Sequence, residues 1–154
     1  MRIPRIYMPT AFSNGDTIEL DENAFSHAVR VLRLKQGDGL ILFNGEGGEF
    51  EAVLNDVQKK RATARIGQFH DKDCESPLPI ILGQCISRGE KMDYTIQKAV
   101  ELGVTEIVPL FSERCGVKLD AKRIEKRLRH WHSVIISACE QCGRNRIPTL
   151  HEAI

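Results

Sequence analysis

The pattern of apolar residues changes in the middle of the chain. Before residue 70, short apolar or alternating runs stand between turn residues, at 17–20, 39–43, 49–57 and 61–69. After Pro79, two continuous apolar runs, 80–86 and 107–111, flank a helical pattern at about 90–102. Alternation is typical of strands with one solvated face, whereas continuous apolar strands are typical of a parallel sheet that is covered on both faces. The sequence therefore predicts an α+β chain of two domains, 1–72 and 73–154, with the boundary in the polar, proline-containing segment 70–77.

One short helix interrupts the strands of the first domain. Asp21 is its predicted N-cap, and it ends before Gly37. Its predicted apolar face consists of Ala24, His27, Ala28, Val31 and Leu32. Asn44-Gly45 predicts a hairpin between two strands, because both residues tolerate positive φ. Strands with one inserted helix indicate a small closed barrel.

The second domain begins with a βαβ unit and continues with a helix at about 121–141. The predicted buried stripe of that helix steps by threes and fours. It consists of Ile124, Leu128, Trp131, Ile135, Ala138 and Cys142. Two parallel strands and two helices cannot cover both faces of a sheet. The sequence therefore indicates that this domain is truncated or that a partner completes it.

Composition restricts the location of the protein more than its function. No apolar run approaches the roughly 20 residues of a membrane span, and residues 1–7 lack a secretory signal, so we expect a cytoplasmic protein without membrane association. Five irregularly spaced cysteines favour reduced thiols over a disulfide framework. The net charge is only +1, but residues 114–146 carry nine Lys and Arg against three Asp and Glu. This local excess could attract a polyanion.

Polar and basic residues follow both predicted strands of the second domain. Arg88 and Lys91 follow the first strand, and Glu113, Arg114 and Lys118 follow the second. Ligand sites of parallel α/β sheets form at the carboxyl ends of the strands. The two arginines could each hold a phosphate bidentately, and Glu113 could accept a proton or orient an arginine. A helix amino terminus beside an ordinary surface ion pair explains the same residues.

Six segments of the chain carry a resemblance to a known family. They are 1–7 (MRIPRIY), 29–33 (VRVLR), 83–92 (GQCISRGEKM), 96–103 (IQKAVELG), 112–118 (SERCGVK) and 138–144 (ACEQCGR). These segments resemble the RsmE family of 16S ribosomal RNA uridine-N3 methyltransferases. Together they extend over nearly the whole chain. Several matched blocks in the right order are far more specific than any single short motif.

The resemblance implies a PUA-like RNA-binding β-barrel followed by the first part of an α/β SPOUT methyltransferase domain that lacks its carboxyl-terminal knot. It implies a methyl transfer from S-adenosylmethionine to N3 of a uridine in 16S rRNA of the 30S subunit, and a homodimer for the full-length protein. The family's cofactor-binding segments have no counterpart before Ile154, so the pocket is expected beyond residue 154. We therefore expect this chain alone to be inactive. Glu113 and Arg114 are candidate catalytic residues, and the base stays unidentified.

The predicted RNA-binding residues are all basic. They are Arg2, Arg5, Arg30, Arg33, Arg88, Lys91, Arg114, Lys118 and Arg144. For the arginines of the first domain, a solvated surface is an equal alternative to phosphate contact. The same two interpretations stay open for the basic residues of the last helix, which are Lys122, Arg123, Lys126, Arg127 and Arg129.

Three other interpretations remain to be weighed. A zinc site at His130, His132, Cys139 and Cys142 is rejected, because the two cysteines fall on a predicted helix and a second closely spaced ligand pair in a loop is missing. A non-catalytic PUA-like RNA-binding module is the main alternative function. An unrelated α/β enzyme that acts on a small phosphorylated substrate at Arg88 and Arg114 is a third.

Overall fold

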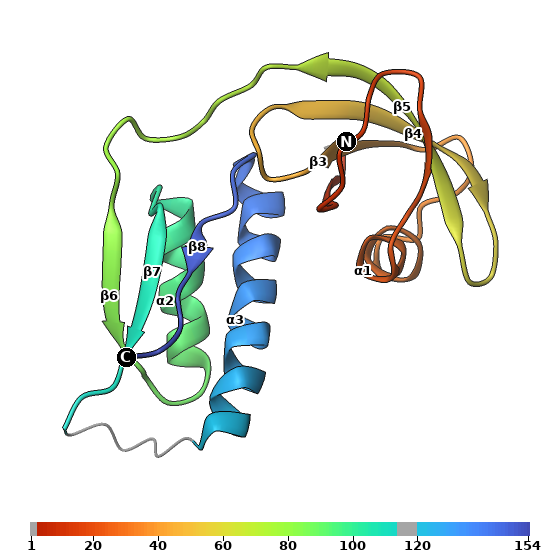
Figure 1. Ribbon diagram of the computed structural model, residues 1–154. Helices are drawn as coiled ribbons and strands as arrows, with labels where there is room; N and C mark the ends of the chain where they lie inside the picture. Colours follow the sequence, from red (N-terminus) through yellow and green to blue (C-terminus); the bar gives the residue numbers. More distant parts are fainter. Residues whose placement is uncertain (1–2, 114–119) are drawn as a thin grey trace. The chain divides into compact units, whose positions relative to one another are not determined.

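A computed structural model gives the fold of residues 3–113 and 120–154 (Figure 1). The chain divides into two compact units. The first unit comprises Met1–Cys74 together with Gly143–Arg146, and the second comprises Glu75–Cys142 and Ile147–Ile154. No sequence pattern indicated that four residues of the second half belong to the first unit. The boundary between residues 72 and 73 stays a prediction.

The first unit is built on a five-stranded sheet in the order β1-β3-β4-β5-β2. Its strands are β1 (Arg5–Tyr7), β2 (Thr17–Glu19), β3 (Gly39–Phe43), β4 (Glu49–Val57) and β5 (Ala62–His70). β1 runs parallel to β3, and the other pairs are antiparallel. The four predicted strands are confirmed to within a residue at each end. β1 (Arg5–Tyr7) was not predicted.

The core of the first unit confirms the alternation seen in the sequence. Leu40 and Leu42 of β3, Leu54 of β4 and Ile66 of β5 are almost fully buried. The Asn44-Gly45 hairpin joins β3 to β4, and the side-chain oxygen of Asn44 accepts a hydrogen bond from the backbone N–H of Glu46 at 3.1 Å. In the same loop Gly48 has a φ of 68°, and a Cβ added there would lie 2.3 Å from the ring of Phe69, so another residue would strain the backbone and displace that ring.

The inserted helix departs from the sequence prediction halfway along. Asp21 is its N-cap, accepting a hydrogen bond from the backbone N–H of Ala24 at 2.8 Å as predicted, and α1 runs over Glu22–Phe25. From Ser26 to Val31 the chain forms a π-helix, η1. Because π-turns carry more residues per turn, the spacing of an α-helix no longer holds. The prediction that Val31 and Leu32 lie on the apolar face is therefore wrong: they are 68% and 40% exposed.

The second unit is a parallel three-stranded sheet in the order β6-β7-β8, with two helices. Its elements are β6 (Ile81–Cys85), α2 (Glu90–Glu101), β7 (Glu106–Leu110), α3 (Ala121–Cys142) and β8 (Thr149–Leu150). The predicted βαβ unit and the last helix are confirmed. β8 was not predicted, because it has only two residues.

The helices of the second unit pack against each other and bury one face of its sheet. Figure 1 shows α2 and α3 side by side, and Met92, Ile96 and Val100 of α2 are fully buried. Trp131 and Ile135 of α3 are also fully buried, which confirms the predicted stripe. On the sheet, Ile107 is buried whereas Ile81 is 61% exposed. The two faces therefore differ, and the helices cover only one of them.

Candidate functional site

The carboxyl ends of β6 and β7 bring two of the predicted loops to one edge of the second unit. The strands are paired in parallel with Cys85 opposite Leu110, and the backbone N–H of Ile86 donates to the carbonyl of Leu110 at 3.0 Å. The loops that carry Arg88 and Glu113 therefore start side by side. Both side chains are exposed, as is that of Lys91 in the first turn of α2. The convergence of these side chains on one ligand stays a prediction.

Three predicted residues lie outside the described residues. They are Arg2, Arg114 and Lys118. That Arg88 and Arg114 lie at one site on this edge therefore also stays a prediction.

In the first unit, Arg30 and Arg33 lie on or just after η1 and are exposed. The guanidinium of Arg30 stands over the ring of Phe25, 5.4 Å from its centroid. Arg33 has a φ of 58°, a left-handed conformation that costs energy for a residue with a side chain. The two arginines flank Val31 and Leu32, so this surface presents positive charge beside exposed apolar groups.

Arg5 and Arg144 are placed differently, in what we call the Arg5–Glu49 cluster: Arg5, Glu49, Lys72, Arg144 and Asn145. Arg5 is only 8% exposed, and its guanidinium forms an ion pair with Glu49. It also donates to the side-chain oxygen of Asn145 at 2.6 Å and to the backbone carbonyl of Arg144 at 3.1 Å. Arg144 is 4% exposed. The guanidinium of Arg5 therefore has little left for a phosphate, and Arg144 is almost fully buried, so we do not carry either residue into the proposed RNA contacts.

The remaining contacts of the Arg5–Glu49 cluster close it around the carboxylate. Asn145 donates to Glu49 at 3.3 Å and to the backbone carbonyl of Lys72 at 3.0 Å, and the ammonium of Lys72 lies 3.3 Å from Glu49. Burial alone would raise the pKa of Glu49. The hydrogen bond and charge of Arg5, helped by Lys72 and Asn145, outweigh burial and hold the pKa below its ordinary value.

Sequence reasoning missed Glu49 and Asn145 as the partners of Arg5. They stand 44 and 140 positions away from Arg5 along the chain. A single sequence contains no signal for a pairing at such separations. These buried contacts nevertheless matter for function, because they distinguish arginines that hold the fold together from arginines that are exposed to a ligand.

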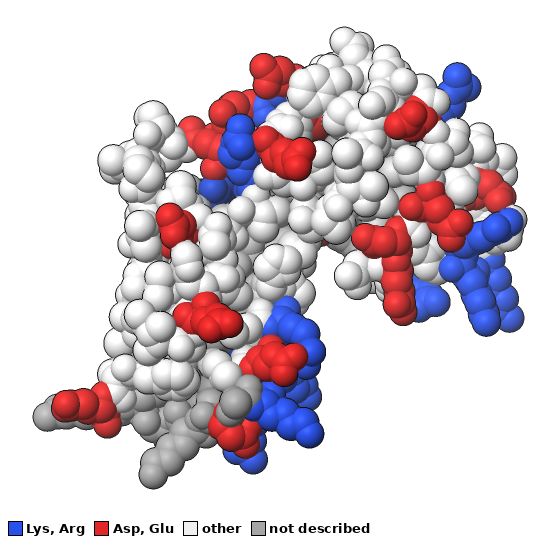
Figure 2. All heavy atoms as spheres, in the orientation of Figure 1, with Lys and Arg blue, Asp and Glu red and all other residues white. Residues whose placement is uncertain are grey.

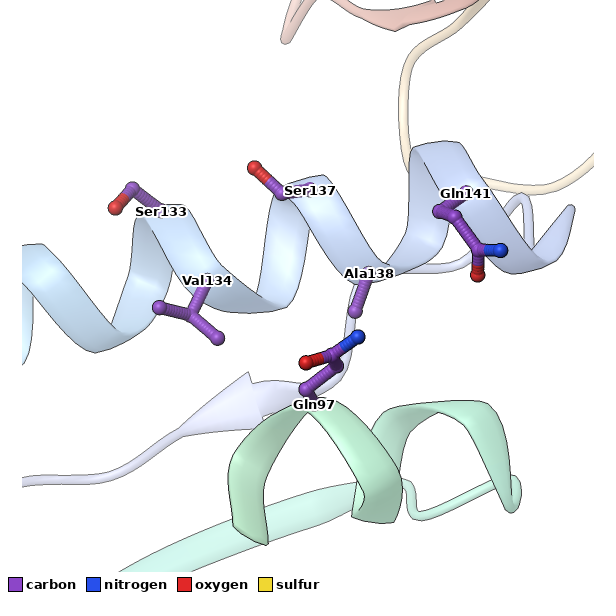
Figure 3. Close-up of a pocket in the computed structure, with 6 residues that line it drawn as sticks. All are labelled: Gln97, Ser133, Val134, Ser137, Ala138 and Gln141. Carbon is purple, nitrogen blue, oxygen red and sulfur yellow. The ribbon is translucent and has the colours of Figure 1, made fainter. Parts of the chain in front are cut away.

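A groove of about 350 Å³ lies between α2 and α3 (Figure 3). Its six lining residues are Gln97, Ser133, Val134, Ser137, Ala138 and Gln141. The side chain of Gln97 points towards Ala138 and donates to Glu101 at 3.1 Å. The lining contains no charged group and no nucleophile stronger than a hydroxyl. We therefore assign no chemistry to this groove.

The described residues offer neither a metal-binding group nor a membrane-spanning helix. Within residues 3–113 and 120–154, no three His, Cys, Asp or Glu side chains come together in a group that could hold a metal ion. Cys139, one of the residues considered for zinc, is fully buried on α3. None of the helices described here has both the length and the apolar character of a membrane span.

Comparison with known families matches both halves of the chain. The sequence model of the RNA methyltransferase domain matches residues 74–154, and the model of the RNA methyltransferase PUA domain matches residues 20–67. The ribosomal RNA small subunit methyltransferase E of Buchnera aphidicola subsp. Schizaphis graminum is 40% identical over 149 residues. This match covers 97% of the chain and 61% of the relative.

Two solved structures are similar over the full described fold. A methyltransferase from Legionella pneumophila, in complex with bound S-adenosylmethionine, matches with a TM-score of 0.98 and 45% identity, covering 100% of this chain and 64% of that chain. The ribosomal RNA small subunit methyltransferase E of Neisseria gonorrhoeae, bound to S-adenosylmethionine, matches with a TM-score of 0.95 and 46% identity, covering 99% and 63%. The chain thus spans about three fifths of the length of these relatives.

Proposed function

The chain belongs to the RsmE family of RNA methyltransferases, and from this premise we propose that it binds ribosomal RNA of the small subunit in order to methylate it. The observation that carries the proposal is the similarity to ribosomal RNA small subunit methyltransferase E along 97% of the chain. Because the chain spans about three fifths of such relatives, the activity proposed is that of the complete protein.

In the first unit we assign RNA contact to Arg30 and Arg33. Both guanidinium groups are exposed and always charged, and their planar fork of donors matches the oxygens of a phosphate. Val31 and Leu32 stand between them and expose apolar surface, against which a base or ribose can pack. The left-handed backbone of Arg33 supports this assignment, since strain of this kind is concentrated at binding sites.

In the second unit the proposed contacts are Arg88 and Lys91, with Arg114 and Lys118 outside the described residues. Arg88 follows β6, and Lys91 lies in the first turn of α2. Both are at the carboxyl edge of a parallel sheet, where ligands of such sheets bind. We therefore propose that this edge holds the RNA near the reacting uridine.

The finer assignment, methylation at N3 of a uridine in 16S rRNA of the 30S subunit, follows the family resemblance. N3 lies on the pairing edge of uracil, so the target base must be unpaired before a methyl group can reach it. N3 must also lose its proton to a base or to surroundings that stabilise the resulting anion. Glu113 is exposed just after β7 and is a candidate for that part. We further propose a homodimer acting in the cytoplasm.

The cavity beside the carboxyl end of β7 does not by itself fit S-adenosylmethionine, the proposed methyl donor. This cavity has a volume of about 330 Å³, and it is lined by Phe111, Ile124, Glu125, Leu128, Glu152 and Ala153. These side chains are apolar or acidic, so they include no donor for the carboxylate of the cofactor. We assign no cofactor contact to residues 1–154 and derive no step through the cofactor.

The experiment that tests the proposed function is a paired methylation assay. Residues 1–154 and the complete product of the gene are each incubated with labelled S-adenosylmethionine and unmodified small ribosomal subunits. We expect transfer by the complete product alone. Methylation at N3 blocks base pairing, so reverse transcription should stop at the modified uridine.

The outcomes separate the candidate functions. If the complete product binds the RNA but transfers no methyl group, it acts as a non-catalytic RNA-binding module instead. Affinity for small sugar phosphates without salt-dependent binding to ribosomal RNA would favour the third function. Tight cofactor binding by residues 1–154 alone would contradict our view of the cofactor pocket.

A further inference from the structure

The amino-terminal half of α3 carries most of the positive charge of that helix. Its cations, which we call the α3 basic face, are Lys122, Arg123, Lys126, Arg127 and Arg129. Figure 2 shows Lys and Arg side chains gathered there in one patch. In the carboxyl-terminal half, the outward positions Ser133, Ser137 and Gln141 are polar but neutral. The lysines and arginines of α3 are therefore confined to its amino-terminal half.

Packing fixes the direction of the α3 basic face. Trp131, Ile135 and Cys139 of the same helix are fully buried, which holds α3 in one rotation against the rest of the second unit. As a result Lys122 and Lys126 are exposed to solvent, while Arg127 is half-buried. The cations of the α3 basic face therefore stand on a helix that is anchored by buried side chains.

The counter-charges near the α3 basic face are few and weakly held. Arg123 lies 3.6 Å from Asp120, and Arg129 lies 2.9 Å from Glu125. Both pairs are more than 60% exposed, so water and salt compete with them. Lys122, Lys126 and Arg127 have no ion-pair partner among the described residues. A phosphate group would meet three unpaired cations and two easily opened pairs.

The arrangement is unfavourable for the helix itself. Lys122 and Lys126, like Arg123 and Arg127, are four positions apart and therefore lie next to each other on the helix surface, where like charges repel. Lys122 and Arg123 also stand in the first turn, where the helix dipole favours acidic side chains. Asp120 caps the helix by accepting from the backbone N–H of Arg123 at 2.8 Å, but the first turn has no acidic residue.

α2 shows what an ordinary solvated helix of this protein looks like. It has Glu90 and Asp93 in its first turn, and Lys98 near its end pairs with Glu101 at 2.7 Å. This distribution agrees with the dipole and mixes both signs. Solubility alone therefore does not require the one-sided charge of α3.

We propose that the α3 basic face is a second RNA-binding surface, which holds phosphates of the same RNA by charge and without reading its bases. This inference rests on the proposed function, because it takes ribosomal RNA as the polyanion. Lysine and arginine contacts to phosphates are independent of sequence and release counterions. The surface would therefore add affinity and salt dependence, and leave the choice of nucleotide to other residues.

The test compares two double variants that remove the same charge. Lys122→Gln with Lys126→Gln removes two cations from the α3 basic face. Lys59→Gln with Lys60→Gln is the matched control, since both lysines are exposed in the first unit and also have no ion-pair partner among the described residues. Binding of the 154-residue chain to a small-subunit ribosomal RNA transcript is measured at several salt concentrations.

We expect the α3 variant to bind about tenfold more weakly at low salt. The slope of log affinity against log salt should become shallower by roughly 1.5, as about two lost phosphate contacts require. The control should stay within about twofold of the parent chain. Thermal unfolding should show both variants folded, and Lys126→Gln alone should give about half of the change in slope.

Failure of this inference is distinguishable from failure of the proposed function. One outcome is that the α3 variant shows the same dependence of affinity on salt as the control, while Arg30→Gln with Arg33→Gln loses binding. In that case the RNA-binding function stands, and the proposal that the α3 basic face binds RNA is overturned. If the parent chain shows no salt-dependent binding to the transcript, the inference fails, and if the complete product of the gene shows none either, the proposed function fails as well.

Discussion

The Arg5–Glu49 cluster and the α3 basic face both contain arginine and lysine, but the arginines of the cluster are buried whereas most of the α3 basic face is exposed to solvent. In the cluster, the side chains of Arg5 and Glu49 are only 6% and 10% exposed, and the guanidinium binds three internal acceptors. On α3, the side chains of Arg123 and Arg129 are each 71% exposed, and each has one loosely held counter-charge. Burial therefore decides whether an arginine of this chain holds the fold together or remains free to meet a ligand.

The same difference divides four of the arginines that the sequence predicts to bind RNA. Arg5, Arg30, Arg33 and Arg144 are indistinguishable in charge, but only Arg30 and Arg33 keep their guanidinium groups at the surface. We therefore expect charge removal to affect stability at the buried positions and RNA binding at the exposed ones.

Removing one charge from each region should give very different losses of stability. Glu49→Gln leaves the buried guanidinium of Arg5 without its anion, so we expect the free energy of unfolding to fall by about 3 kcal/mol. Glu125→Gln breaks the exposed pair with Arg129 and should cost less than about 1 kcal/mol. Urea unfolding of both variants measures the difference. Equal losses would show that the cluster is not the structural element described here.

Asn145→Ala tests the anchoring of residues 143–146 in the first unit. The side chain of Asn145 bonds to Arg5, Glu49 and the backbone of Lys72, so its loss leaves buried polar groups unsatisfied. We expect a destabilisation of about 2 kcal/mol by urea unfolding. Gln141→Ala, at an exposed position of α3, is the control and should change the stability only slightly. An equally small effect of Asn145→Ala would contradict the anchoring.

The lowered pKa of Glu49 predicts a pH dependence with a definite sign. A carboxyl whose pKa is lower in the folded state stabilises the protein above its unfolded pKa, and this stabilisation is lost as the pH falls through the folded value. The urea midpoint of the parent chain should therefore decrease as the pH falls below about 5. Glu49→Gln should show a shallower decrease, whereas Glu125→Gln should follow the parent. Parallel curves for Glu49→Gln and the parent would count against the cluster as the cause.

The elements of the fold could largely be predicted from the sequence, because their signals are local. Strand alternation, the Asp21 cap and the stripe of α3 are patterns within one helix or strand, and each is confirmed. The fold class, a PUA-like strand-rich part followed by a SPOUT methyltransferase part, is confirmed by the family models and the solved structures. The absence of the knot stays a prediction.

The failures have two physical causes, which are dependence on distant parts of the chain and a change of helical pitch. Arg5 was assigned to the surface because nothing near it in the sequence announces Glu49 or Asn145 as partners. Val31 was assigned to the core because the spacing of an α-helix was assumed where the chain forms η1. For the candidate site, the sequence predicts which residue types lie at the carboxyl edge of the sheet. It does not predict which guanidinium groups remain exposed.

The smallest predicted effect is the one that most sharply separates the two regions. Lys122→Glu puts an acid into the first turn of α3 and creates a favourable pair with Lys126 four residues later, so the free energy of unfolding should rise by about 0.5 kcal/mol at low salt. The gain should disappear near 1 M salt, where the charges are screened. The same change should weaken binding to the RNA transcript, while Lys122→Gln should be intermediate in both measurements. No substitution of a charged group in the Arg5–Glu49 cluster is expected to raise stability in this way. A loss of stability in Lys122→Glu would mean that Lys122 supports the fold. The charges of α3 could then no longer be distinguished from the structural charges of the Arg5–Glu49 cluster.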